Sequence, residues 1–296
     1  MALHPQAERA MALWAQGPRV TDPGYDITDQ RRLARELAAA ETREQVARVA
    51  DVDADGVPCR VFEPEGARGP VIVFLHGGGF VFGDLDTHDA HARRMANRTA
   101  CTVLAVDYRR PPEHPFPAAP DDVDTAVSWL AGNAHDLGVD PDRMVALGDS
   151  AGGNLALVAA LRRPGRFAAT VLVYPFVDPA MRFDSYRREA GGLGAAEGAW
   201  YWQQYLADPA HRDHPDASPI DATTLGTLPP TLVQAAEHDP LVDEDAELAR
   251  RIEAAGAKVT LTTYPGMIHG FWRQTAMFDA AEEALAEIAD FLRRTL

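Results

Sequence analysis

Lysine is almost absent from this chain of 296 residues, since Lys258 is the only lysine. Even with arginine counted, 28 basic side chains face 44 acidic ones, so the formal net charge at pH 7 is −16. Nucleic acids and anionic membrane surfaces attract proteins through clustered positive charge, which this sequence lacks. We therefore expect neither a nucleic acid nor a membrane as a partner.

Cysteines and long apolar runs are scarce as well. The two cysteines, Cys59 and Cys101, lie in apolar strand-like segments, where we expect buried free thiols, although the sequence leaves a disulfide open. No apolar run approaches the ~20 residues that a membrane-spanning helix needs. Glu8 and Arg9 interrupt what would be the apolar core of a signal peptide. These features predict a soluble, cytoplasmic protein.

Serine is rare too, and one of the four serines, Ser150, occupies a distinctive position. It is the centre of Gly148-Asp-Ser-Ala-Gly152, between a short apolar strand and an apolar helix. Such a strand-to-helix turn exposes the serine hydroxyl above the sheet, and glycines flank it because strand and helix approach closely there. The helix also directs its first N–H groups and its positive dipole end toward that hydroxyl. Ser150 is therefore the candidate nucleophile.

The rest of the chain predicts the fold around this turn. Near-continuous apolar strands alternate with helices from Pro70 onward, and a hairpin with an Asp55-Gly56 turn precedes them. This pattern predicts an α/β fold with a mostly parallel, eight-stranded sheet and helices on both faces. The expected strands cover residues 49–53, 57–62, 71–75, 102–106, 143–147, 170–174, 231–236 and 258–264. The expected helices cover residues 87–97, 118–135, 151–162, 243–255 and 277–294, with two further helical pieces before residue 47.

One long interval interrupts this alternation. About 50 residues separate Tyr174-Pro175 from the next expected strand, and they include an aromatic helix around residues 200–205. An insertion of this length at the carboxyl ends of the strands is typical of a lid over a binding site. We expect an N-terminal helical part of the cap at 1–47 and a catalytic domain at 48–296, with the cap insertion at about 178–226.

A serine nucleophile needs a base, and the carbonyl that it attacks needs donors for the developing oxyanion. The segment His76-Gly-Gly-Gly-Phe80 directly follows the first buried strand. Three successive glycines free their N–H groups to turn toward a ligand, where the N–H of Ala151 can join them. His76 itself is interpreted as a scaffold for this loop, and Asp149 as a structural hydrogen-bonding group.

The base and its acidic partner should follow the last two strands. His269 follows the final strand and Asp239 the one before it, so the chain order of nucleophile, acid and base is the one expected of α/β-hydrolases. Two rival acids stand nearby. Glu237 is expected to lie too close to its strand, and Asp243 to cap the next helix.

Several segments together resemble the hormone-sensitive-lipase-like carboxylesterases, bacterial family IV of the α/β-hydrolases. They are His76–Phe80, Asp107–Arg109, Pro112–Ala119, Gly148–Asn154, Asp239–Leu241 and His269–Phe271. The resemblance covers the chain from about residue 70 to its end. It implies the α/β-hydrolase fold with a helical cap, a dimer through the last strand or helix, and Ser150, Asp239 and His269 as the catalytic triad. It also implies Gly78, Gly79 and Ala151 as oxyanion-hole donors, with Gly77 shaping the loop.

The sequence thus predicts a serine carboxylesterase without a cofactor, acting on short- to medium-chain esters of small molecules. A role as an amidase, lactonase or deacetylase, or as a non-catalytic ligand-binding protein, stays open. Arg110-Pro111 stands where the family usually has Leu-Ala, and the effect of this departure stays open too. Phe80 and Phe82 are expected to line an apolar substrate pocket, and so are Trp202 and Tyr205 unless they pack inside the cap. No metal is expected, although residues 86–91 or 211–216 could be drawn as a metal site.

Overall fold

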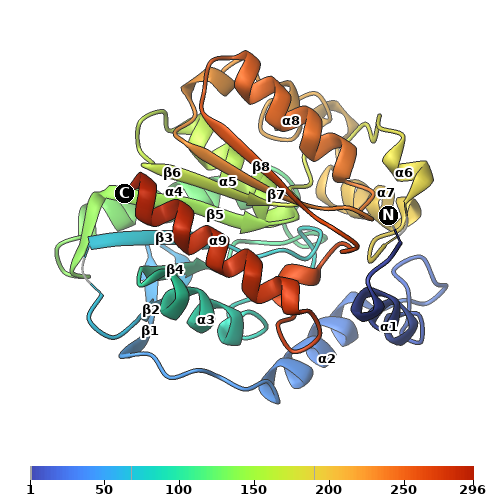
Figure 1. Ribbon diagram of the computed structural model, residues 1–296, viewed down its shortest axis with the longest axis horizontal. Coiled ribbons are helices and arrows are strands. Elements are labelled where there is room, and N and C mark those ends of the chain that lie inside the picture. The colour runs from blue at the N-terminus through green and yellow to red at the C-terminus, as the bar shows by residue number, and fades with distance from the viewer. Residues whose placement is uncertain (1, 68, 190) are drawn as a thin grey trace.

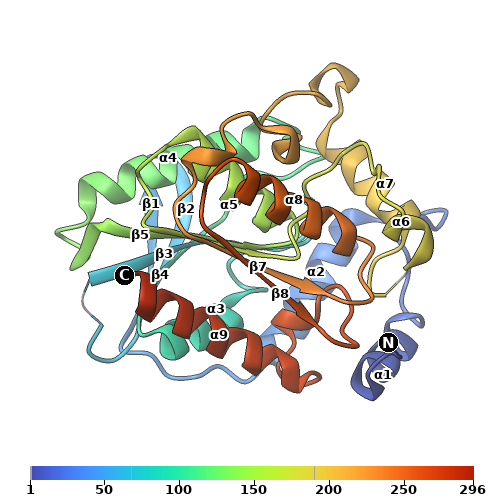
Figure 2. The same ribbon diagram turned by 45° about the horizontal axis from the view of Figure 1, so that its top comes forward.

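The computed structural model describes residues 2–67, 69–189 and 191–296. Its centre is an eight-stranded sheet with helices on both faces (Figures 1 and 2). The strands lie in the spatial order β1-β2-β4-β3-β5-β6-β7-β8, and β2 is antiparallel to both of its neighbours, whereas the other pairs are parallel. The strands are β1 (Arg48–Ala54), β2 (Val57–Glu63), β3 (Gly69–Leu75), β4 (Thr102–Val106), β5 (Val139–Asp149), β6 (Ala169–Val173), β7 (Thr231–Ala236) and β8 (Val259–Tyr264).

The helices divide between the two faces of the sheet. Helices α4, α5 and α8 cover one face, and α3 and α9 cover the other (Figure 2). Helices α1, α6 and α7 lie together at one end of the molecule in both views. The helices are α1 (Pro5–Trp14), α2 (Ile27–Ala39), α3 (Asp89–Thr99), α4 (Ala118–Asn133), α5 (Ala151–Arg162), α6 (Ser185–Arg188), α7 (Ala195–Tyr205), α8 (Val242–Ala254) and α9 (Asp279–Thr295).

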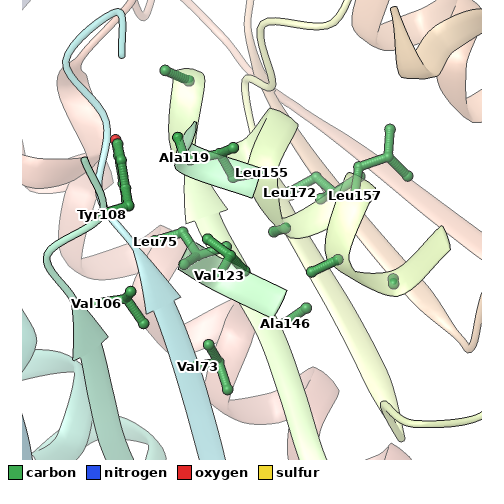
Figure 3. Close-up of a cluster of buried hydrophobic side chains, with 14 of the residues drawn as sticks. Val73, Leu75, Val106, Tyr108, Ala119, Val123, Ala146, Leu155, Leu157 and Leu172 are labelled. Carbon is green, nitrogen blue, oxygen red and sulfur yellow. The ribbon is translucent and has the colours of Figure 1, made fainter. Parts of the chain in front are cut away.

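Burial explains why the strands lack alternation. Every residue of β4, β6 and β7 is buried, because helices cover both sides of these strands. Figure 3 shows part of one of the two resulting cores, to which Leu75 of β3, Val106 of β4 and Leu155 of α5 all contribute. Cys59 belongs to this core and Cys101 to the one on the opposite face, so the two buried thiols are free, as expected.

The predicted fold class is confirmed, and the expected strands and helices are present with ends shifted by at most four residues. The largest shift is at β5, which begins at Val139 because its first residue pairs with Gly69 of β3. One local expectation is wrong. Asp243 does not cap α8, since Leu241 is the capping residue and the Asp243 carboxylate accepts a hydrogen bond from Ser185 N (2.9 Å) instead.

None of the helices in the described parts of the chain combines the length and apolar character that a membrane span requires.

The topology brings four loops to one edge of the sheet. Strands β3, β5, β7 and β8 are parallel, so their carboxyl ends meet at the same edge. The chain runs from β3 to β4 on one side and then crosses back past β3 to β5 on the other, so the direction of the crossovers reverses at β3. Open α/β sheets bind ligands at such a point. The glycine loop, Ser150, Asp239 and His269 follow these four strands in turn.

Candidate active site

The turn that carries Ser150 is as tight as its glycines predict. Ser150 has φ +55° and ψ −119°, a strained conformation for a side-chain-bearing residue, between the end of β5 and the start of α5. A Cβ placed on Gly152 would lie 1.8 Å from the carbonyl oxygen of Leu75, so only glycine fits where α5 passes β3. Ser150 N donates to Val173 O (2.9 Å), which fixes the turn against β6. The first N–H groups of α5 are therefore held beside the serine hydroxyl.

His269 connects Ser150 with Asp239. Its Nε2 lies 3.0 Å from Ser150 Oγ, and its Nδ1 lies 2.7 Å from Asp239 Oδ2. Asp239 is fully buried, and its Oδ1 accepts a hydrogen bond from Leu241 N (2.9 Å) immediately before α8. His269 N in turn donates to Gly191 O (2.9 Å), which holds the histidine loop in place.

The two rival acids are held by other groups. Glu237 accepts a hydrogen bond from Gly266 N (2.8 Å) at the turn after β8. Asp243 binds Ser185 N and the Arg188 guanidinium, 3.0 Å away. The structure thus directs Asp239, and not the rival carboxylates, to His269.

The glycine loop after β3 forms a compact turn. Gly77 N donates to Asp149 Oδ1 (2.9 Å), so this N–H shapes the loop and is not available to a ligand, and Asp149 has the structural role expected of it. Gly78 has φ +121°, and a Cβ there would lie 2.5 Å from the Phe82 carbonyl oxygen. The N–H groups of Val81 and Phe82 both donate to Gly78 O (3.1 and 2.8 Å), which closes the turn.

A cavity of about 220 Å³ opens between this loop and the catalytic serine candidate. Ser150, His269, Gly78 and Gly79 line it. Ala151, buried as the first residue of α5, stands directly after Ser150. The other lining side chains are of two kinds, apolar or aromatic (Ala34, Phe82, Tyr174, Phe176, Leu193, Tyr201) and polar (Thr87, His88, Asp149, Glu197, Arg273).

Of the four residues expected to line the pocket, Phe82 does so and the other three do not. Phe80, Trp202 and Tyr205 are buried beside one another, with the Phe80 and Tyr205 rings stacked at 3.7 Å and 2°. The expectation for Phe80 is wrong, and for Trp202 and Tyr205 the alternative of packing inside the cap holds, because all three rings form the packing between α7 and the glycine loop. Tyr201 of the same helix lines the cavity instead. The sequence predicted an aromatic helix here but did not indicate which of its rings faces the cavity.

Helical spacing explains this difference. Gly198, Trp202 and Tyr205 follow one another at intervals of four and three residues and face the core. Glu197 and Tyr201 form the adjacent stripe, which faces the cavity. The sequence contains this periodicity, but it does not say which stripe meets the substrate.

The buried histidines near the cavity are neutral and structural. Burial and a nearby positive charge lower the pKa of His76 to about 3, and its ring stacks on Tyr108 at 4.3 Å. The pKa of His88 also lies well below its ordinary value, mainly because the ring is buried and secondly because the positive charge of Arg273 is close. Arg273 Nη1 can only donate to His88 Nε2 (3.3 Å), so His88 Nδ1 carries the proton and donates to Thr87 Oγ1 (3.0 Å). His76 is thus a scaffold, as expected, and in the described residues no cluster suited to a metal ion occurs at 86–91 or 211–216.

Two buried acids lie behind Asp239 in the first turn of α8. Glu244 accepts hydrogen bonds from Val177 N (2.9 Å) and Tyr186 Oη (2.7 Å). Asp245 is fully buried, and neither of its oxygens has a hydrogen-bond partner among the described residues. Burial, followed by the charges of Asp239 and Glu244, raises the pKa of Asp245 well above its ordinary value. Asp245 therefore holds a proton in the fold that the unfolded chain releases above about pH 4.

We expect Asp245→Asn to stabilise the protein more at pH 8 than at pH 4.5. A raised pKa means that wild-type stability falls as the pH rises from about 4 through the folded-state pKa, and asparagine removes this loss. Each pH unit between the ordinary and the folded-state pKa costs the wild type about 1.4 kcal/mol, so Tm at pH 8 should rise by at least about 2–4 °C. Thermal unfolding across the pH range measures this, with exposed Glu253→Gln of the same helix as the control. A Tm difference that stays constant with pH contradicts the prediction.

Comparisons with known proteins place this chain in a family. The family model for the alpha/beta hydrolase fold matches residues 72–273. An ethyl acetate hydrolase of Pseudomonas putida is 36% identical over 255 residues, which cover 82% of this chain and 80% of that protein. A carboxylesterase of Mycobacterium tuberculosis is 38% identical over 253 residues, covering 81% of this chain and 79% of that protein.

Solved structures agree with these relatives. A hyperthermophilic esterase from the archaeon Pyrobaculum calidifontis superposes with a TM-score of 0.90 at 36% identity, and the match covers 99% of both chains. An esterase from the bacterial hormone-sensitive lipase family gives a TM-score of 0.87 at 32% identity, covering 100% of this chain and 99% of that one. The chain belongs to the α/β-hydrolase family, in which it is a carboxylic ester hydrolase of the hormone-sensitive-lipase type.

Proposed function

We propose that this protein is a serine carboxylesterase that hydrolyses short- to medium-chain esters through an acyl-enzyme. Ser150 is the nucleophile, His269 the general base, and Asp239 the acid that orients it. The observation that carries the proposal is the continuous hydrogen-bond chain from Ser150 Oγ to His269 Nε2 (3.0 Å) and from His269 Nδ1 to Asp239 Oδ2 (2.7 Å). This is the geometry that activates a serine hydroxyl for attack on a carbonyl.

The reaction follows from this arrangement. Ser150 Oγ attacks the ester carbonyl carbon while His269 Nε2 takes its proton, and the carbonyl oxygen becomes an oxyanion. The N–H groups of Gly78, Gly79 and Ala151 stabilise that oxyanion. When the tetrahedral intermediate collapses, the ester C–O bond breaks and His269 gives its proton to the departing alcohol. Water then attacks the acyl-enzyme by the same route, which releases the acid and restores Ser150.

The cap segments 1–47 and 178–226 limit the substrate. Ala34 of α2 and Tyr201 of α7 belong to these segments, and both line the cavity beside Ser150. The cavity volume of about 220 Å³ is below the range of ~300–1,000 Å³ that is typical of sites for drug-sized ligands. A short acyl chain fits such a space, whereas a long one has to displace the cap.

We expect kcat/KM for p-nitrophenyl esters to peak between the acetate and the hexanoate. By the dodecanoate it should fall at least about tenfold, since even one methylene that the pocket does not accommodate costs about 1–3 kcal/mol. The test is the series from acetate to dodecanoate, with the p-nitroanilide of the best acyl group as the comparison for amidase activity. Faster turnover of the dodecanoate than of the butyrate contradicts the chain-length proposal. A preference for the anilide contradicts the esterase proposal.

The nucleophile has its own test. A p-nitrophenyl phosphonate should inactivate the enzyme with release of one equivalent of p-nitrophenol, and peptide mapping should find the adduct on Ser150. Labelling of Ser128, Ser185 or Ser218 in place of Ser150 would show that the nucleophile is assigned wrongly.

A further inference from the structure

A single guanidinium of helix α2 joins three segments of the chain around the glycine turn. Arg31 Nε donates to the carbonyl oxygen of Val81 (2.9 Å), and its Nη2 donates to the carbonyl oxygen of Pro111 (2.7 Å). Its Nη1 donates to Glu113 Oε1 (2.8 Å). The Arg31 side chain is 15% exposed, so water competes little for these contacts. Arg31 thus ties α2 to the segment after the turn and to the loop after β4.

Two further arginines hold the same segment. Arg35, one helical turn after Arg31, donates from Nε to Asp84 Oδ2 (2.5 Å). Arg110, the departure from the family pattern, donates to the carbonyl oxygen of Gly83 and pairs with Asp107 (3.0 Å). Three arginine side chains therefore bind the segment 81–84, at Val81, Gly83 and Asp84.

The hydrogen bond from Arg31 to Val81 is linked to Gly78 through one residue of backbone. The carbonyl oxygen of Val81 accepts from Arg31, while the N–H of Val81 donates to Gly78 O (3.1 Å). Val81 is fully buried, so its peptide groups depend on these partners. The position of Arg31 is thereby transmitted to Gly78, which lines the cavity beside Gly79.

We propose that Arg31 is a positioning residue for the reaction, which holds the Gly78 and Gly79 N–H groups where the oxyanion forms. This inference rests on the proposed oxyanion role of these two residues. Preorganised donors stabilise a transition state only if they already point at the developing charge, and small displacements are costly. Arg31 acts through the turn and does not touch the substrate. α2 therefore contributes to the rate and not only to the walls of the cavity.

The matched pair of variants is Arg31→Ala and Arg32→Ala. Arg32 lies next to Arg31 on α2, but its side chain is 61% exposed and binds only Glu36 (2.6 Å) and Asp29 (3.6 Å) of its own helix among the described residues. We expect Arg31→Ala to lower kcat for p-nitrophenyl butyrate by about ten- to a hundredfold, with KM within about threefold of wild type. Arg32→Ala should keep wild-type kcat and KM.

An aryl trifluoromethyl ketone supplies the second readout. It reacts reversibly with a serine hydroxyl to give a hemiketal oxyanion, so its Ki reports on the oxyanion donors. In Arg31→Ala the Ki should rise by the same factor by which kcat/KM falls. Wild-type kcat and Ki together with a lowered Tm would overturn the inference, because Arg31 would then only stabilise the fold. An increase in KM at unchanged kcat would overturn it as well.

Arg31→Lys covers the case in which Arg31→Ala does not fold. A lysine ammonium keeps the charge but reaches only one of the three acceptors, so kcat should still fall while Tm stays near wild type. Full kcat in Arg31→Lys would overturn the inference. A wild-type enzyme that neither hydrolyses the butyrate nor binds the ketone would instead refute the proposed function, which keeps the two failures distinct.

Discussion

Replacing Asp239 by asparagine should lower kcat for p-nitrophenyl butyrate by about 10⁴-fold at pH 7, with little change in the fold. The reason lies in the two contacts of this buried carboxylate. Leu241 N donates to Oδ1, so an asparagine has to place its carbonyl oxygen there and its NH₂ group toward His269 Nδ1. His269 Nδ1 must then accept, which leaves the proton on Nε2, where it faces Ser150 Oγ. A histidine in that tautomer cannot take the serine proton.

Glu237→Gln is the matched control for Asp239→Asn. It also neutralises an acid that follows β7, but Glu237 binds Gly266 N at the turn after β8. We expect its kcat to stay within about twofold of wild type, as for a substitution away from the reacting groups. Steady-state kinetics and circular dichroism of both variants measure the difference. A large loss in Glu237→Gln with an active Asp239→Asn would reverse the assignment of the acid.

The main residues of the site could be located from the sequence because each follows a strand of a parallel sheet. Apolar runs followed by glycines or other turn residues indicate where β3, β5, β7 and β8 end, and the parallel arrangement brings those ends together. Ser150, Asp239 and His269 therefore occupy positions that the topology alone makes neighbours. Their hydrogen bonds depend on details that the sequence pattern does not contain, such as the contact of Asp239 with Leu241 N.

The walls of the cavity were harder to predict because aromatic residues serve both packing and binding. Phe80 follows the glycines directly, yet its ring stacks on Tyr205 in the core, whereas Phe82 two residues later lines the cavity. Both are hydrophobic residues beside the same loop, so composition does not separate them. Only the packing of α7 against the loop decides which ring faces the substrate.

The arginine contacts around the glycine turn could not be predicted for a different reason. The sequence shows α2 as a charged, weakly apolar helix lying on another part of the protein. Arg31 meets Val81 and Pro111, which are 50 and 80 positions away along the chain. Arg110, whose effect the sequence left open, pairs with Asp107 and donates to the Gly83 carbonyl oxygen. Long flexible side chains find such partners only after the backbone topology is set.

Gly78→Ala should lower kcat by about 10²- to 10³-fold with a much smaller effect on KM, which is the loss caused by removing an oxyanion-hole donor. Gly78 has φ +121°, outside the range that an alanine adopts comfortably. Its new Cβ would lie 2.5 Å from the carbonyl oxygen of Phe82, which is backbone and cannot rotate away. The turn from Gly78 to Phe82 must then open, which moves the Gly78 and Gly79 N–H groups away from their proposed oxyanion-binding positions.

The control for Gly78→Ala has to share its backbone strain but not its location. Gly138 also has a positive φ, +67°, and a Cβ there meets nothing within 4 Å. It precedes the first residue of β5, at the opposite end of that strand from Ser150. Gly138→Ala should therefore cost about 1–2 kcal/mol of stability and leave kcat unchanged. Equal losses of kcat in the two variants would mean that strain in the fold limits the rate, whereas a loss confined to Gly78→Ala assigns it to the geometry of the turn.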